Sequence, residues 1–156
     1  MADITREHVV PMIVLENKLF PIIKRDDLVQ AEQVLIHWGD MALIAKEEDK
    51  ELDRLGYRTN MPDLNNPMSR YLAAGINLIG RLSTLAPNYR VNRGGRGRLS
   101  CRNVQGLSSL DLIKAIKYHM EASITGLPVA GELLRSWQLG QDFLVSEAAC
   151  RIINNR

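Results

Sequence analysis

Apolar residues recur along this chain at spacings of three and four, which is the period of an amphipathic α-helix. No segment shows the alternation of a half-buried strand. The sequence therefore predicts an all-α fold, a bundle of about six helices with a long loop between the third and the fourth. The predicted helices cover about residues 11–20, Asp26 or Asp27 to Gly56, Asn66–Pro67 to about Leu85, Ser108 to just before Gly126, about 129–139, and a last helix after Asp142.

Residues that start or stop helices define these boundaries. Gly56 is a natural C-terminal breaker for the second helix. Asn66 followed by Pro67 favours the start of the third helix, because proline is tolerated at the first helical position. Ser108, with Asp111 three residues later, is typical of the start of the fourth.

The chain has 156 residues, of which 46% are hydrophobic and 5% aromatic. This length fits one domain over 1–156, with a core of Leu, Ile, Val, Met and Ala rather than aromatic side chains. A subdivision into a helical core over 1–86, a basic loop over 87–106 and a C-terminal helical unit over 107–156 fits the same pattern.

Positive charge is concentrated in one stretch of thirteen residues, RVNRGGRGRLSCR, which contains three glycines and no acidic residue. Guanidinium groups match phosphate oxygens, and glycine lets a backbone approach a sugar–phosphate strand closely. We therefore expect this stretch to bind double-stranded DNA. A subunit arm that contacts an acidic neighbouring copy, and an idle solvated loop, are the alternatives. The candidate nucleic-acid-binding residues are Arg90, Arg93, Arg96, Arg98 and Arg102.

Charge also differs between the two halves of the chain. Residues 1–64 hold 8 Lys/Arg and 13 Asp/Glu, whereas residues 65–156 hold 12 Lys/Arg and 5 Asp/Glu. Such asymmetry is typical of nucleic-acid contact or of head-to-tail assembly. It favours a homo-oligomer in which the acidic half of one copy meets the basic half of the next.

The sequence contains no recognisable catalytic or metal-binding pattern. Its three histidines are not grouped with acids or cysteines at metal-ligand spacings, and Cys101 and Cys150 are not spaced as a pair. The glycines of the basic stretch are not followed by the Lys-Ser/Thr of a phosphate loop, and the acidic run at 47–53 is typical of a solvated helix face. We expect a protein that is not an enzyme and has no cofactor or metal.

The N-terminus carries charged residues before any apolar run, unlike a signal peptide. No stretch approaches the roughly 18 apolar residues that would span a bilayer. We therefore expect a cytoplasmic protein with no membrane contact, in the host cytoplasm if the chain is viral.

Residues 126–154 have the order of a helix-turn-helix, with a helix, a turn at 139–141 and a second helix. The second of these helices presents Phe143 and Glu147 and few donors for base edges. Helical packing or a subunit contact is the favoured interpretation of this pair, and DNA reading is the alternative.

An Asp-led helix with an aromatic residue near its middle ends in Gly, and a polar turn then reaches an Asn-Pro pair and a long helix. These features resemble the core of phage terminase small subunits, the non-catalytic DNA-recognition partners in genome packaging, over about 65 residues. The resemblance implies a DNA-recognition subunit that assembles as a ring. The residues that carry it are Asp27, Trp38, Gly56, Asn66-Pro67 and the closing run Leu85-Ala86-Pro87-Asn88-Tyr89-Arg90.

Three functions are consistent with these features. The first is a non-catalytic, oligomeric DNA-binding accessory protein, similar to a terminase small subunit, whose partners are double-stranded DNA, further copies of itself and a large motor subunit. The second is a phage or bacterial transcription regulator, antiterminator-like, that reads DNA through residues 126–154. The third is an interaction factor, such as an inhibitor of a host enzyme, whose arginines meet an acidic partner.

Overall fold

The computed structural model describes residues 3–82, 104, 106–122 and 126–155. This part of the chain is α/β, with seven helices and a four-stranded sheet, so the all-α prediction is wrong. In chain order the elements are β1 (Ile4–His8), α1 (Met12–Lys24), α2 (Leu28–Trp38), β2 (Met41–Ala45), α3 (Lys46–Arg54), α4 (Ser69–Ala73), β3 (Leu78–Leu82), α5 (Ser109–Ala122), α6 (Gly126–Gln138), β4 (Phe143–Ser146) and α7 (Glu147–Asn154).

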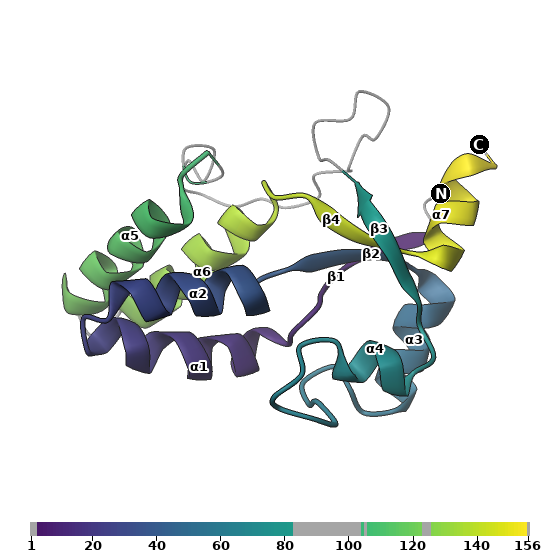
Figure 1. The fold of residues 1–156 in the computed structure, drawn as a ribbon, viewed down its shortest axis with the longest axis horizontal. Coiled ribbons are helices and arrows are strands. Elements are labelled where there is room, and N and C mark those ends of the chain that lie inside the picture. Colours follow the sequence, from purple (N-terminus) through teal and green to yellow (C-terminus); the bar gives the residue numbers. More distant parts are fainter. Residues whose placement is uncertain (1–2, 83–103, 105, 123–125, 156) are drawn as a thin grey trace.

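The sheet is mixed, with the strand order β1-β2-β4-β3. Its two central strands run parallel, with Met41 opposite Phe143 and Leu43 opposite Val145. Each outer strand is antiparallel to its neighbour, β1 to β2 and β3 to β4. Helices α1, α2, α5 and α6 gather beyond one end of the strands, whereas α3, α4 and α7 lie around the sheet (Figure 1).

The chain contains the same βααβα unit twice. The first unit runs from β1 through α1, α2 and β2 to α3, and the second runs from β3 through α5, α6 and β4 to α7. Equivalent elements have similar lengths, with 13 and 14 residues in α1 and α5, and 9 and 8 residues in α3 and α7. Helix α4 belongs to the segment that joins the two units.

Backbone hydrogen bonds also repeat between the two units. The N–H of Lys46, the first residue of α3, donates to the carbonyl of Asp3 at 3.0 Å. The N–H of Glu147, the first residue of α7, donates to the carbonyl of Asn77 at 2.9 Å. Asp3 and Asn77 immediately precede the outer strands. Each unit therefore ties the start of its last helix to the start of its first strand.

The two central strands are buried on both faces. All five residues of β2 and all four of β4 are buried. One face of these two strands belongs to the main core, which also contains side chains of α1, α2, α3, α5 and α6. A strand covered on both faces is apolar at successive positions, which is why period-two alternation is absent from the sequence. The face that packs on α7 forms a cluster of Met41, Leu43, Phe143, Val145 and Ala149.

The predicted continuous helix over 26–56 is wrong, because a strand interrupts it. Helix α2 ends at Trp38, and Gly39 is its C-cap. A Cβ atom at residue 39 would lie 2.4 Å from the carbonyl oxygen of Leu35, so glycine is required at this turn. Gly56 follows α3 with a φ of 77°, as expected of a glycine that ends a helix.

Two further predicted helices are replaced in part by strands. Residues 67–82 form the short α4 and the strand β3 rather than one long helix. After Asp142 the chain forms β4 before α7 begins, so the helix-turn-helix interpretation of 126–154 is also wrong. The predicted helices at α1, α5 and α6 are confirmed, although α6 begins as early as Gly126. Ser108 caps α5 as expected, with its hydroxyl accepting from the Asp111 N–H at 3.1 Å.

The repeat predicts that most of the β3–α5 connection is dispensable for folding. In the first unit residues 9–11 suffice between β1 and α1, whereas residues 83–108 connect β3 to α5. Replacing 84–102 with a Gly/Ser linker of about eight residues, which can span roughly 26 Å, should therefore preserve the fold. Circular dichroism should show the parent helix content and a melting temperature within about 5 °C of the parent value. An unfolded variant would contradict the equivalence of the two units.

Candidate functional site

The arginines predicted to bind DNA lie outside the described residues, and the structure therefore does not place them. It does place the residues on either side, Leu82 at the end of β3 and Val104 before the start of α5. Val104 and Leu107 pack against the main core. The described residues thus hold both ends of the connection that contains Arg90, Arg93, Arg96, Arg98 and Arg102.

This connection is the main difference between the two βααβα units. Three residues join β1 to α1, whereas 26 residues, 83–108, join β3 to α5. At the other equivalent connections the two units differ by at most two residues. Because the first unit closes with a short turn at the equivalent place, the extra length is not needed for closure. Connections longer than about 15 residues in compact domains are uncommon and are usually either functional or linker segments.

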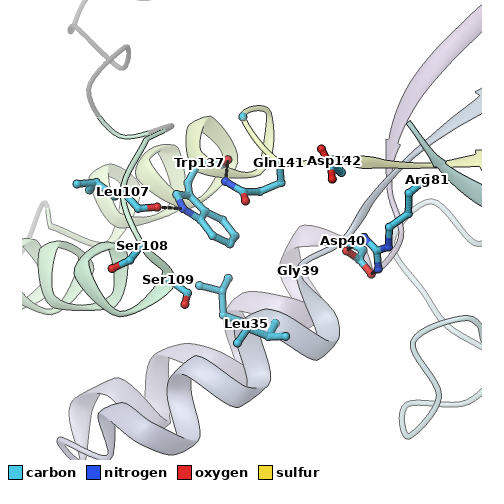
Figure 2. A pocket seen from close by; sticks show the side chains of 12 residues that line it. Leu35, Gly39, Asp40, Arg81, Leu107, Ser108, Ser109, Trp137, Gln141 and Asp142 are labelled. Atoms are coloured by element: carbon cyan, nitrogen blue, oxygen red, sulfur yellow. Dashed lines mark hydrogen bonds and ion pairs between the residues drawn. The ribbon is translucent and has the colours of Figure 1, made fainter. Parts of the chain in front are cut away.

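A pocket of about 460 Å³ lies beside the two ends of this connection. Its walls come from the end of α2, from β3, from the start of α5 and from the turn between α6 and β4. Figure 2 shows Trp137 at one end of the pocket and the Asp40–Arg81 pair at the other, with Gln141 and Asp142 along one side. The pocket therefore combines an aromatic ring with several charged and polar groups.

Arg81 and Asp40 form a two-point ion pair at this pocket. The Nη1 and Nη2 groups of Arg81 donate to the two carboxylate oxygens of Asp40, each at 3.1 Å. Hydrogen bonding to Asp40, with a smaller contribution from the charge of Asp142, raises the pKa of Arg81. The Asp142 side chain is exposed and forms no hydrogen bond or ion pair with another described residue.

Trp137 fixes the start of α5 against the rest of the pocket wall. Its indole Nε1–H donates to the carbonyl of Leu107 at 2.9 Å. The neighbouring Ser109 hydroxyl donates to Glu32 of α2. The residues that follow the arginine-rich stretch are therefore bonded to both α6 and α2.

A second pocket, of about 480 Å³, adjoins the first. The two pockets share Ile36, Asp40 and Arg81. From these residues the second pocket extends along the polar turn at 65–68. The Asp40–Arg81 pair thus lines both hollows.

The described surface does not carry the positive charge of the chain. All 18 Asp/Glu but only 14 of the 20 Lys/Arg lie among the described residues. The excess of positive charge therefore belongs to the arginine-rich stretch. Several of the described cations are further engaged in ion pairs, among them Arg54, Arg58, Arg70, Arg81, Lys117, Arg135 and Arg151.

A buried cluster around Arg70 occupies the corresponding junction of the first unit. The Arg70 side chain is fully buried and donates to the carbonyls of Val9 at 2.8 Å and Tyr57 at 2.7 Å. It also donates to the Glu7 carboxylate at 2.6 Å and to the carbonyl of His8. These bonds tie the β1–α1 junction to the segment between α3 and α4.

Burial shifts the pKa values of the last two residues of β1, Glu7 and His8. Burial raises the pKa of Glu7, although the charge of Arg70 opposes this change. Burial and the positive charges of Arg135 and Arg70 lower the pKa of His8 to about 4. The Nδ1 atom of His8 is buried without a hydrogen-bond partner. His8 is therefore neutral near pH 7 and cannot contribute a positive charge there.

Sequence reasoning missed both the Asp40–Arg81 pair and the Arg70 cluster. Arg81 is 41 residues from Asp40, and Arg70 is 63 residues from Glu7. No local motif marks pairs that are so far apart, so only the fold brings them together.

The described residues show neither a metal site nor a helix that could span a membrane. Among the described residues no group of His, Cys, Asp and Glu is arranged to hold a metal ion. None of the described helices has the length and apolar character needed to cross a membrane. Comparison of the chain with protein-family models, with curated proteins and with solved structures finds no match.

Replacing Arg70 with Ala should destabilise the protein by about 3–5 kcal/mol, because it leaves a carboxylate and several carbonyls buried without their donor. Urea unfolding followed by circular dichroism measures the loss. Arg54→Ala is the matched control, since Arg54 pairs with Glu51 at the surface and should contribute little. Equal effects of the two substitutions would show that the Arg70 cluster does not hold the fold.

The lowered pKa of His8 predicts a stability that falls in acid. The unfolded chain takes up a proton at His8 below pH 6.5, whereas the folded chain resists protonation down to about pH 4. Between about pH 7.5 and pH 5 the parent should lose roughly 2 kcal/mol more than a His8→Gln variant. Urea unfolding at the two pH values compares them. Identical losses in both proteins would assign the acid sensitivity to other groups.

Proposed function

We propose that this protein binds double-stranded DNA through its arginine-rich stretch at 90–102 and acts as a non-catalytic accessory protein. One observation carries the proposal. A connection of 26 residues, with five arginines and no acid, stands where the equivalent connection of the repeat has three residues. This extra length is not required for closure, and it contains the excess positive charge of the chain, which favours contact with phosphates.

The proposed binding has little sequence preference. Arginines on a glycine-containing connection supply phosphate contacts, which position a protein on DNA without reading bases. The regulator alternative requires a base-reading helix pair at 126–154, but these residues form α6, a buried strand and α7, which give no support to a recognition helix. The regulator alternative therefore loses the feature on which it depended.

Self-association is part of the same proposal. Several copies of one weak phosphate-binding stretch would add their contacts on a single duplex. The described residues carry more Asp/Glu than Lys/Arg, so the surface of one copy suits contact with the arginines of another. The more specific resemblance to terminase small subunits is weakened. It requires one long helix from Pro67, whereas the described residues form α4 and β3 there.

Replacing Arg93, Arg96 and Arg98 together with Ala should weaken binding to every duplex by a similar factor. Each lost phosphate contact should also flatten the slope of log K against log salt by about one unit, because fewer counterions are released. Fluorescence anisotropy with a labelled duplex, over about 50–200 mM salt, measures both the affinity and the slope.

Lys24, Lys50 and Lys114 provide the matched control, since all three are exposed and lie on helices outside the arginine-rich stretch. Replacing these three with Ala removes the same charge and should preserve most of the affinity. Equal losses in the two triple variants would assign binding to net charge alone. Unchanged DNA affinity in the arginine variant would overturn the proposal, and sedimentation of that variant would then show whether the arginines join copies of the chain.

A further inference from the structure

A further pocket, of about 400 Å³, lies at the junction of the first unit, where β1 meets α1. Its walls come from β1, from the start of α1, from α3 and the residues after it, and from α6. Both Glu7 and His8, whose pKa values are shifted by burial, line this pocket. A hollow lined by titratable groups with shifted pKa values is a candidate ligand site.

One end of this pocket carries a carboxylate that the fold holds in place. The Glu7 side chain is 22% exposed, and its Oε1 atom accepts from the buried Arg70 at 2.6 Å. Arg70 is itself fixed by the carbonyls of Val9 and Tyr57. The second carboxylate oxygen of Glu7 accepts from no described residue. This oxygen is therefore available to a ligand group that donates hydrogen bonds.

The charges around Glu7 favour a positively charged group. Asp49 of α3 lines the same pocket, and besides burial its negative charge raises the pKa of Glu7. Arg58 also lines the pocket, but it donates to the two carboxylate oxygens of Asp53 at 2.5 and 2.8 Å. Because Arg58 and Arg70 are both paired with carboxylates, the charge of Asp49 is left unbalanced among the described residues. An ammonium group would be attracted to this end.

The other end of the pocket favours a negatively charged group. The Arg135 side chain lines it and is 52% exposed, and the Glu16 carboxylate lies 3.8 Å away, beyond hydrogen-bond distance. Besides burial, the charge of Arg135 lowers the pKa of His8, so this guanidinium acts on the pocket wall. The backbone N–H groups of Met12 and Ile13, at the start of α1, bond to no described residue. Together they suit a carboxylate.

We infer that this pocket binds a small zwitterion of dipeptide size, with its ammonium group at Glu7 and its carboxylate at Arg135. A volume of about 400 Å³ is sufficient for such a molecule, and the half-exposed Ile13 side chain offers it apolar contact. Oppositely charged ends favour a ligand whose two charges are several bonds apart. The inference is independent of DNA binding, because it uses described residues only and none of the arginines at 90–102.

Three forms of one dipeptide test the inference by isothermal titration calorimetry on the full chain. They are leucyl-leucine, its N-acetyl form, which lacks the ammonium group, and its C-terminal amide, which lacks the carboxylate. Leucyl-leucine should bind roughly tenfold more tightly than either blocked form, because each blocked form loses one charge-assisted hydrogen bond. Equal affinity for the three forms, or no binding of leucyl-leucine at millimolar concentration, would overturn the inference.

Two variants assign each charge of the ligand to one end of the pocket. Glu7→Gln keeps an acceptor for Arg70 and should abolish the preference over the N-acetyl form while preserving the preference over the amide. Arg135→Gln should do the opposite. Arg54→Gln removes a charge from the exposed surface of α3 outside the pocket and should preserve both preferences. Loss of a preference in the Arg54 variant would assign the effect to net charge and contradict the site.

Circular dichroism shows whether each variant is folded. Glu7 belongs to the buried cluster, so its variant is the one at risk of unfolding. In that case Arg135→Gln decides alone, because this half-exposed side chain forms no close ion pair. If leucyl-leucine still binds this variant more tightly than its amide does, the inference is wrong, whereas DNA binding by the arginine-rich stretch is untouched.

Discussion

The parallel pairing of β2 with β4 is the interaction on which the rest of the structure depends. These strands are the central elements of the two βααβα units, and both are buried on their two faces. Parallel neighbours begin at the same edge of a sheet, so the residues that precede them, Asp40 and Asp142, come to the same pocket. The pairing therefore builds the core and also assembles the pocket from distant parts of the sequence.

The helices could be predicted from the sequence where one face of a helix packs on the core. Helices α1 and α5 show the expected spacing, and Ser108 and Gly56 act as cap and breaker. The strands could not, because MALIA and FLVS are apolar at nearly every position and stand next to helices. A short apolar run that is buried on both faces cannot be told from part of a buried helix by periodicity alone.

The candidate site, like the fold, could be predicted from the sequence only in part. The arginine-rich stretch is evident from composition alone, because its charges are neighbours in sequence. The pocket and the Arg70 cluster depend on pairs such as Asp40 with Arg81, which only strand pairing and helix packing bring together. The repeat adds what composition lacks, since it shows that the arginine-rich connection exceeds what the fold requires. Charge and excess length thus belong to one connection, and the described residues at its two ends lie beside the pocket.

Arginine-specific chemical modification, followed by mass spectrometry with and without duplex DNA, tests most directly whether this stretch is the DNA-binding surface. Each modified residue is identified individually, so the contact is located rather than inferred from affinity. DNA should protect Arg93, Arg96 and Arg98, whereas the exposed Arg25 and Arg151 should react equally in both samples. Protection of Arg25 or Arg151, with unchanged reactivity of the three central arginines, would contradict the account.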